Sequence, residues 1–243
     1  MRLFGLLGEK LDHSFSPSYF ADKFKELKLQ EVSYEKFEIP SIGEVDKILS
    51  KADLVGFNVT IPYKSAIIPF LDELSPEAKA VGAVNTVKKQ GEKWVGYNTD
   101  VIGFAKSIRP FFEPQHQRAI ILGTGGASKA VAYALKGLGT QYIFVSRNPS
   151  GPQEISYDKL SKELIQSCPF IINTTPIGCF PNMEEAPNIP YEGIGPQHFL
   201  MDLIYNPTET KFLSSGKKRG ATSLNGLQML YFQADAAWEI WNS

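Results

Sequence analysis

One stretch, residues 118–139, restricts the possible folds of this chain more than any other. An apolar run (RAIIL) leads directly into a glycine-rich turn (GTGGAS), and a segment rich in Ala and Leu follows. This order predicts a buried strand, a tight turn and a helix, which together form the repeating unit of a parallel α/β sheet. Further strand-like runs at 141–147, 169–173 and 198–204 alternate with helical stretches. We therefore predict an α/β fold with a mostly parallel sheet.

The first half of the chain shows the same alternation but has no glycine-rich loop. Strands are expected at 3–7, 32–39, 54–61, 83–89 and 93–96, and helices at 17–29, 42–49, 64–74, 100–112 and 225–242. The chain has 243 residues, which is enough for one large domain or two modest ones. We expect a second unit to begin after the helix at 100–112, where the sequence FFEP ends the helical pattern.

Composition excludes several classes of protein. The chain has 25 basic and 26 acidic side chains, and this near-zero net charge argues against a nucleic-acid partner. No apolar run approaches the ~18 residues of a membrane span, and the first residues lack the pattern of a signal peptide. Cys168 and Cys179 stand outside any CxxC pattern and are expected to be free thiols. We expect a cytoplasmic protein without a structural metal or a membrane partner.

The glycine-rich turn predicts a site for a dinucleotide. Gly123 allows the tight turn after the strand, and Gly125 and Gly126 allow the backbone to approach a pyrophosphate. The helix that follows offers free N–H groups and the positive end of its dipole. A purely structural turn is the alternative, but the order of strand, turn and helix favours cofactor binding.

The sequence after this turn favours NADP over NAD. NAD-binding units place an acid about 20 residues after the turn, where it holds the ribose 2′-hydroxyl. No Asp or Glu occurs here between Gly123 and Glu154, and Arg147 ends the next strand. A guanidinium at this point suits a 2′-phosphate, with Ser146 and Asn148 as further donors. The alternative for Arg147 is an ordinary exposed loop arginine.

Polar residues in the first half lie where a core strand should be apolar. Asn58 and Thr60 share one face of the strand at 54–61, and Lys64 follows it closely. Asn85 and Thr86 end the segment GAVNT. Either such groups satisfy one another in the core, or they line a pocket.

Two further polar clusters have the same character. Ser14 and Ser16 stand two residues apart, and Ser16 could also cap the helix that Pro17 starts. Thr99 and Asp100 precede the helix at 100–112, where either could be only a cap. One lysine, one aspartate and many hydroxyls and amides predict a site for a small polyhydroxylated molecule next to a hydride carrier.

Tyr19 and Lys23 match the YxxxK spacing of short-chain dehydrogenases. In those enzymes the pair follows the dinucleotide turn, whereas here it precedes the turn by about a hundred residues. We therefore expect Tyr19 to be a packing residue of its helix.

Read together, these motifs resemble the shikimate dehydrogenase family. The matching segments are HSFSPS (13–18), FNVTIPYK (57–64), GAVNT (82–86), YNTD (97–100), GTGGASKA (123–130), NTTPIG (173–178), DLIYNPTETKFL (202–213) and NGLQML (225–230) with Gln233. The resemblance implies two α/β domains with a cleft between them: residues 1–100 with 221–243 bind substrate, and residues 101–220 form a Rossmann-like NADP-binding domain.

The resemblance also implies an activity, the NADPH-dependent reversible reduction of 3-dehydroshikimate to shikimate in aromatic amino-acid biosynthesis. Lys64 and Asp100 would form the catalytic pair, and the protein would be a monomer or a homodimer. The implied substrate-binding residues are Ser14, Ser16, Thr60, Asn85, Asp100, Tyr205 and Gln233. The implied cofactor-binding residues are Gly123, Thr124, Gly125, Gly126, Ala127, Ser146, Arg147, Asn148, Thr174, Leu203 and Gly226.

The sequence departs from the family pattern at two places. The segment after Arg147, NPSGPQEISY, is too short for the usual crossover helix, so we predict a loop there. Pro76 occupies the position of a glutamate that the family usually places on the cofactor side.

Three alternatives stay open. A quinate/shikimate dehydrogenase of broader specificity is disfavoured by Ser16, where such relatives often have Thr, and by the missing acid. Methylene-tetrahydrofolate dehydrogenases share the architecture but lack the NVTxPxK and YNTD segments. A non-catalytic shikimate-binding sensor is disfavoured because Lys64 and Asp100 are both present.

Overall fold

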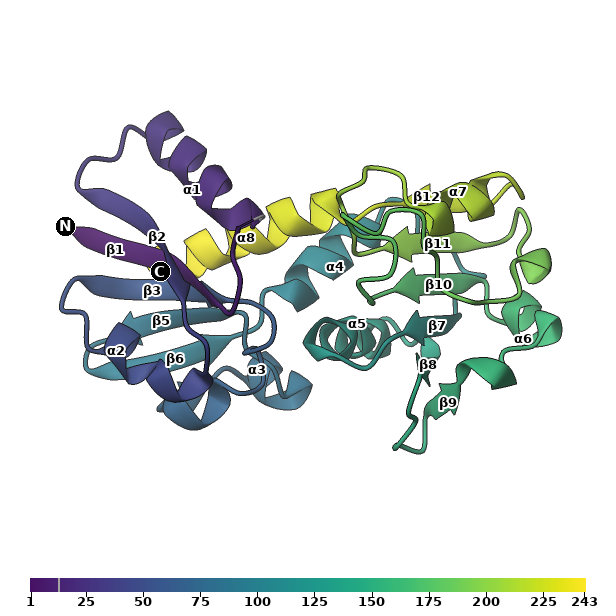
Figure 1. Cartoon of the computed structure of the whole chain (residues 1–243), viewed down its shortest axis with the longest axis horizontal. Coiled ribbons are helices and arrows are strands. Elements are labelled where there is room, and N and C mark those ends of the chain that lie inside the picture. Colours follow the sequence, from purple (N-terminus) through teal and green to yellow (C-terminus); the bar gives the residue numbers. More distant parts are fainter. Residues whose placement is uncertain (13) are drawn as a thin grey trace. The chain divides into compact units, whose positions relative to one another are not determined.

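The computed structural model describes residues 1–12 and 14–243; His13, the first residue of the HSFSPS segment, lies outside the described residues. The chain divides into two compact units, Met1–Asp100 with Gln233–Ser243 and Val101–Phe232 (Figure 1). The return to the first unit therefore begins at Gln233, later than the expected boundary at 221. The reason is that strand β12 (Thr222–Leu224) pairs with β11 in the sheet of the second unit.

The first unit contains a six-stranded mixed sheet in the order β2-β1-β3-β5-β6-β4. Its strands are β1 (Arg2–Gly8), β2 (Val32–Glu38), β3 (Leu54–Val59), β4 (Glu73–Leu74), β5 (Thr86–Gln90) and β6 (Lys93–Tyr97). β1 runs parallel to β2 and β3, and β4 runs parallel to β6. β5 is antiparallel to both β3 and β6. A two-residue turn containing Gly91, at φ +63°, joins β5 to β6, and so short a connection permits only the antiparallel arrangement.

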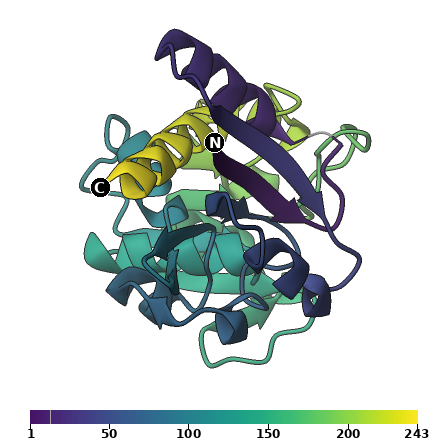
Figure 2. The same ribbon diagram turned by 90° about the vertical axis from the view of Figure 1, so that its left-hand side faces the viewer.

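Helices cover both faces of the first sheet, and the alternation of side chains along β1 decides which residue faces which layer. Phe4 packs with Phe20 of α1 (Phe15–Glu26) and with Trp241 of α8 (Leu227–Asn242). Figure 2 shows α1 in purple and α8 in yellow on the same side of this sheet. Leu3 and Leu7 face the opposite core, which also includes residues of α2 (Asp46–Leu49) and α3 (Pro76–Val81).

The second unit is a doubly wound parallel sheet in the order β12-β11-β10-β7-β8-β9. Its strands are β7 (Arg118–Leu122), β8 (Gln141–Ser146), β9 (Glu154–Ser156), β10 (Phe170–Asn173), β11 (Phe199–Asp202) and β12 (Thr222–Leu224). Its helices are α4 (Asp100–Ile108), α5 (Gly126–Gly137), α6 (Lys162–Ser167) and α7 (Lys211–Lys217). Apolar residues of α4 and α5 pack on one face, and those of α6 and α7 pack on the other. This order reverses at β7 and β10, where ligands of such sheets usually bind.

The strands expected in the second unit at 118–122, 141–147, 169–173 and 198–204 are confirmed, but β9, β12 and α7 of that unit were not expected. Residues 147–153 form no helix, so the expected lack of a crossover helix after Arg147 is confirmed, but residues 154–156 of the expected loop form strand β9. The helix expected at 64–74 was wrong, because the chain forms turns and a short 3-10 segment, Ile68–Phe70. Pro69 explains this outcome, since it lacks an N–H and restricts the residue before it.

Helix α3 was missed in the sequence, although both of its ends carry clear signals. Ser75 Oγ accepts a hydrogen bond from Ala78 N at 3.1 Å, and Gly82 ends the helix at φ +67°. Pro76, which stands where the shikimate dehydrogenase family usually has a glutamate, is the first residue of this helix.

Candidate active site

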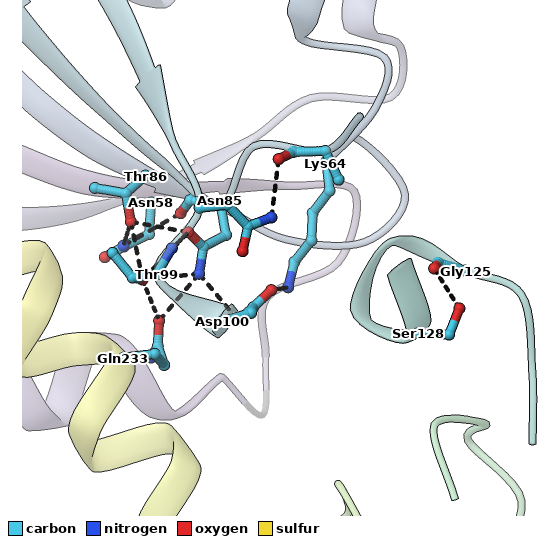
Figure 3. A network of polar contacts seen from close by, with 11 residues as sticks. Asn58, Lys64, Asn85, Thr86, Thr99, Asp100, Gly125, Ser128 and Gln233 are labelled. Carbon is cyan, nitrogen blue, oxygen red and sulfur yellow. Dashed lines mark hydrogen bonds and ion pairs between the residues drawn. The ribbon is translucent and has the colours of Figure 1, made fainter. Parts of the chain in front are cut away.

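Lys64 and Asp100 form a close ion pair in the first unit (Figure 3). Lys64 lies in the turns after β3, and Asp100 is the first residue of α4. Lys64 Nζ lies 2.7 Å from Asp100 Oδ2, and the two side chains are 17% and 7% exposed. Two opposite charges so far removed from water hold each other in place, since either one alone would be costly to bury. The side chain of Asp100 therefore does more than cap a helix.

Asn85 is the centre of the polar network around this pair. Its Nδ2 donates to Asp100 Oδ1 at 2.9 Å, to Thr99 Oγ1 at 2.9 Å and to Gln233 Oε1 at 3.4 Å. Its Oδ1 accepts from the backbone N of Thr99 at 2.7 Å. Both ends of the amide are bonded, so its orientation is fixed with the donor end toward Asp100. Each Asp100 oxygen thus has its own partner, Lys64 on one side and Asn85 on the other.

The network continues from Asn85 into the sheet. Asn58 Nδ2 donates to Thr86 Oγ1 at 3.2 Å, and Thr86 Oγ1 donates to Asn85 Oδ1 at 3.1 Å. The phenol of Tyr34 donates to Asn58 Oδ1 at 2.8 Å. Burial raises the pKa of Tyr34, while a hydrogen bond from the Ser16 side chain acts in the opposite direction. Tyr34 therefore stays protonated, and its phenol extends the network to β2.

The structure answers the capping alternatives for the serines. Ser14 occupies the N-cap position of α1, and among the described residues its side chain makes no capping bond. Ser16 lies inside the helix, so the alternative in which it caps the helix was wrong. Both serines are half-buried.

The other expected substrate residues lie in different places. Thr60 is half-buried just after β3, with its methyl group against Gly8. Gln233, on α8, is buried and accepts hydrogen bonds from Asn85 and Thr99. Tyr205 belongs to the second unit, where it lies near Cys179 and burial raises its pKa.

The YxxxK pair is not arranged as a catalytic base. Tyr19 OH donates to Asp235 Oδ1 at 2.5 Å, and Lys23 Nζ lies 2.5 Å from the same oxygen. Burial, followed by the hydrogen bond to Asp235, raises the pKa of Tyr19 to about 12. A phenol with so high a pKa does not give up its proton near neutral pH. Tyr19 also stacks on Phe15 at 5.3 Å, as expected for a packing residue.

The glycine-rich turn of the second unit leads from β7 into the start of α5. Gly123 has φ +106°, and a β-carbon there would lie 2.8 Å from Thr174 Oγ1. Gly125 is the N-cap of α5 and supplies no side-chain cap, and no described atom lies within 4 Å of the position of its β-carbon. The first N–H groups of a helix have no partner within the helix, so the uncapped start of α5 is a candidate site for an anion. Figure 3 also shows Ser128 Oγ, which donates to the Gly125 carbonyl at 2.6 Å.

The remaining expected cofactor residues follow the carboxyl ends of the strands of this sheet. Thr124 next to Gly125 is exposed, and Gly126 and Ala127 are half-buried in the first turn of α5. Thr174 follows β10, Leu203 follows β11 and Gly226 follows β12. Thr174 Oγ1 donates to the Leu122 carbonyl at 2.6 Å, which ties the ends of β7 and β10 together.

Arg147 and Asn148 are exposed at the carboxyl end of β8. The Asn148 N–H donates to Ser146 Oγ at 3.2 Å, which shapes the turn after the strand. Arg147 lies near Tyr157, whose pKa burial raises and the guanidinium lowers. The exposure of Arg147 is compatible both with a role in ligand binding and with an ordinary loop arginine, so its role in binding the 2′-phosphate stays a prediction.

Comparison with known proteins agrees with this geometry. Residues 6–87 match the family model described as the shikimate dehydrogenase substrate binding domain. A shikimate dehydrogenase (NADP(+)) of Desulforamulus reducens is 36% identical over 98% of this chain and 88% of its own length. The chain belongs to the shikimate dehydrogenase family.

Solved structures of this family have the same fold. Shikimate dehydrogenase 1 from Peptoclostridium difficile is 39% identical, with a TM-score of 0.86 over 100% of this chain and 92% of that one. The Thermus thermophilus enzyme, solved in complex with NADP(H) and shikimate, is 31% identical, with a TM-score of 0.87 over 99% of this chain and 93% of that one. The family resemblance and the two-domain α/β fold predicted from the sequence are therefore confirmed.

A cavity of about 590 Å³ in the second unit lies away from the glycine-rich turn. It includes Arg118 and Gln141, which begin β7 and β8, and therefore lies at the amino ends of these strands. Dinucleotides bind at the carboxyl ends in sheets of this family's type, so this cavity is not the cofactor site.

Within residues 1–12 and 14–243, no helix is both long and apolar enough to span a membrane. The same residues contain no group of three or more His, Cys, Asp or Glu side chains that could hold a metal ion. Cys168 and Cys179 are free thiols.

The sequence analysis missed two residues that take part in polar contacts near the candidate site. Tyr34 stands in a strand of otherwise ordinary alternation, and Asp235 stands on the last helix, two residues after Gln233. Both acquire partners only through the fold, so no local pattern could have identified them.

Proposed function

We propose that this member of the shikimate dehydrogenase family catalyses the reversible NADPH-dependent reduction of 3-dehydroshikimate to shikimate. The observation that carries the proposal is the Lys64–Asp100 pair, whose 2.7 Å contact places an ammonium beside a buried carboxylate. The support from relatives is that curated members carry this activity in their names, and that the Thermus thermophilus enzyme was solved with NADP(H) and shikimate.

In the reducing direction, Lys64 would give a proton to the substrate oxygen. NADPH, when bound, supplies the hydride that the carbonyl carbon receives. The carbonyl oxygen then becomes an alkoxide, which takes the proton from the Lys64 ammonium. Proton transfer by a positioned group of this kind contributes about 10²–10⁴-fold to the rate. Oxidation runs the same steps in reverse, with neutral Lys64 as the base.

Asp100 would orient Lys64 and bind a neighbouring ring hydroxyl. Its two oxygens are already directed by Lys64 and by Asn85, so the carboxylate is fixed before substrate arrives. Preorganisation of this kind avoids reorganisation during the reaction. Ser14 and Ser16 would bind the substrate carboxylate together with Tyr205. Thr60, Asn85 and Gln233 would bind the remaining ring hydroxyls.

The second unit would bind the cofactor. The open space before Gly125 and the N–H groups of α5 fit a pyrophosphate, and a β-carbon at Gly125 would fill part of that space. Arg147, with Ser146 and Asn148, would bind the 2′-phosphate. Thr174, Leu203 and Gly226 would contact the nicotinamide half of the cofactor. The cytoplasmic location expected from the sequence stays a prediction.

The experiment that tests this proposal follows the reduction of NADP⁺ by absorbance, with shikimate and quinate as separate substrates and NAD⁺ as the parallel cofactor. Turnover of shikimate with NADP⁺ alone is the expected result. Comparable turnover of quinate, or with NAD⁺, would place the protein with the enzymes of broader specificity. Binding of shikimate without any turnover would instead support a sensor.

A further inference from the structure

Helix α1, which carries Ser14 and Ser16 at its start, is fixed to α8 by a three-residue polar cluster. Tyr19 and Lys23 lie one turn apart on α1, and both reach the same oxygen of Asp235 at 2.5 Å. Lys23 Nζ also donates to the Tyr19 oxygen at 3.2 Å. The side chain of Lys23 is 20% exposed and that of Asp235 is 43% exposed, so water partly screens the cluster.

The same helix is fixed to β2 on another side. The ring of Phe20 stacks on the ring of Tyr34 at 4.7 Å with an interplanar angle of 15°, and Ser16 lies one helical turn before Phe20. Tyr34 in turn donates to Asn58. Ser16 and Tyr19 are three residues apart and therefore lie on adjoining positions of one helix face. A shift of α1 at Tyr19 would thus be felt at Ser16.

Helix α8 connects this arrangement to the Lys64–Asp100 pair. Gln233, two residues before Asp235, accepts hydrogen bonds from Asn85 and Thr99. Asn85 in turn holds Asp100 (Figure 3). The contacts therefore close a ring within the first unit, through hydrogen bonds and one aromatic stacking contact. Its members, in order, are Asn85, Gln233, Asp235, Tyr19, Phe20, Tyr34, Asn58 and Thr86.

We propose that Tyr19 and Asp235 are positioning residues that fix the Ser14–Ser16 end of α1 relative to the Lys64–Asp100 pair. The inference rests on the proposed function, in which the two serines bind the substrate carboxylate. Substrate is held at both ends, by the serines at one and by Lys64 and Asp100 at the other. Loss of the Tyr19–Asp235 contact loosens the first end and leaves the second intact.

Lys23 has a separate part in this arrangement, which is to balance the charge of Asp235. Burial alone would lower the pKa of Lys23, but hydrogen bonds to Asp235 and Tyr19 outweigh it and raise the pKa. Lys23 is therefore charged at neutral pH. The cluster consequently adds no net negative charge near a helix start that is to bind a carboxylate.

The test compares Tyr19→Phe, Asp235→Ala and the double variant with the wild-type chain in the shikimate and NADP⁺ assay. Tyr19→Phe removes one hydroxyl and keeps the ring contacts with Phe15 and Phe20. A hydrogen bond to a charged partner corresponds to roughly a tenfold change in binding, so KM for shikimate should rise about tenfold. kcat and KM for NADP⁺ should stay within about twofold. The double variant should show little more than the larger single effect on KM for shikimate, because both changes remove the Tyr19–Asp235 contact.

Lys93→Gln is the matched control, since it removes an ion pair with Glu73 at 2.6 Å elsewhere in the same unit. Its kinetic constants should equal those of the wild type. Unchanged KM for shikimate in both Tyr19→Phe and Asp235→Ala would overturn the proposal. So would a fall in Tm accompanied by equal changes in both KM values and kcat, since that outcome describes only structural support.

The wild-type chain is measured first, so that failure of the proposed function is seen separately. If it binds shikimate without turnover, the same variants are compared by calorimetric Kd for shikimate, with the same tenfold expectation. If it neither turns over nor binds shikimate, the proposed function fails and the positioning role is overturned with it.

Discussion

The two units build their polar sites by opposite means. In the first unit, buried side chains are hydrogen-bonded to one another. The single amide of Asn85, for example, contacts Thr99, Asp100 and Gln233. In the second unit the site consists mainly of backbone, with a glycine turn, the start of α5 and an exposed Arg147. The first site should therefore be sensitive to the identity of its side chains. The second should be sensitive to added volume and to backbone conformation.

Topology explains why the first site can be built from side chains. β3 and β5 are antiparallel, with Asn58 opposite Thr86, and β5 and β6 are antiparallel, with Thr86 opposite Tyr97. The end of β3, the start of β5 and the end of β6 therefore meet at one edge. In the second unit every strand pairing is parallel, so the carboxyl ends of all its strands lie at one edge of the sheet. A turn or loop follows each strand at this edge. The edge of the first sheet therefore offers side chains of neighbouring strands, and the edge of the second sheet offers the backbone of turns.

The largest effect is expected from Lys64→Met, which removes the ammonium at the centre of the first site. We expect kcat to fall by about 10²–10⁴-fold, because the proton donor and acceptor is lost. The Kd for shikimate should change only a few-fold, since the serines and Asn85 remain. Stopped-flow kinetics and calorimetry would measure the two quantities separately.

Lys47→Met is the control for this variant, because Lys47 is an exposed lysine of the same unit paired with Glu44. It should leave kcat unchanged. A Lys64→Met variant with kcat near that of the wild type would contradict the assigned proton transfer.

In the second site a matched pair of glycine variants should separate backbone strain from ligand space. Gly123→Ala places a side chain at φ +106° and 2.8 Å from Thr174 Oγ1. Positive φ alone costs about 1–2 kcal/mol, and with the contact we expect the free energy of unfolding to fall by roughly 3 kcal/mol. Gly125→Ala has an ordinary φ of −76° and open space around it. Its stability should change by less than about 0.5 kcal/mol.

Cofactor binding should weaken in both glycine variants, for different reasons. In Gly125→Ala the added methyl group occupies the space meant for the pyrophosphate, so KM for NADP⁺ should rise roughly tenfold. Chemical denaturation and NADP⁺ titration would show the two effects. Equal losses of stability in the two variants would refute the distinction between strain and space.

The same contrast decides what could be predicted from the sequence. The glycine-rich turn, its strand and its helix are contiguous, so local pattern alone placed Gly123 and Gly125 correctly. The loop after Arg147 was also predictable, because ten residues are too few for a crossover helix. The exposed position of Arg147 followed from its place at a strand end.

The first site was only partly predictable, because its members lie far apart in the chain. The odd polar residues Asn58 and Thr86 were noticeable as misfits in a strand, and the structure shows that they bond to each other. The stacking of Phe20 on Tyr34, and the contact of Tyr19 with Asp235 across 216 positions, arise from the packing of α1 on β2 and α8. The prediction of a helix at 64–74 was wrong because it relied on the spacing of apolar residues and neglected Pro69, which disfavours a continuous helix.

Two buried aspartates, one in each unit, extend the comparison to pH. Asp100 faces the cation of Lys64, whereas the donors to Asp202 among residues 1–12 and 14–243 are neutral: Asn173, Thr210 and the N–H of Ile204. Burial raises the pKa of Asp202 to about 6 from an ordinary 3.8, although these donors act in the opposite direction. Between pH 4 and 6 the folded state therefore binds more protons than the unfolded state.

Because the folded state binds the additional proton, the contribution of Asp202 to the free energy of unfolding should decrease as pH rises from 4 to 6. Above this range it should stay constant. A shift of this size corresponds to roughly 2 kcal/mol between pH 4 and 7. Asp202→Asn cannot titrate, so the wild-type minus variant difference in the free energy of unfolding should fall by that amount over the window. Urea denaturation at several pH values would measure it. A difference independent of pH would show that Asp202 titrates normally.

The smallest effect is expected from Arg147→Ala, because the guanidinium is exposed and water screens its interactions. We expect the ratio of kcat/KM with NADP⁺ to kcat/KM with NAD⁺ to fall by roughly tenfold, since only the 2′-phosphate distinguishes the two cofactors. Activity with NAD⁺ and the Tm should stay the same. Lys129→Ala, an exposed cation on α5, is the control and should leave the ratio unchanged. Equal losses of kcat/KM with NADP⁺ and NAD⁺ would mean that Arg147 shapes the turn after β8. The second site would then contain no side chain that distinguishes NADP⁺ from NAD⁺ and would be built from backbone alone.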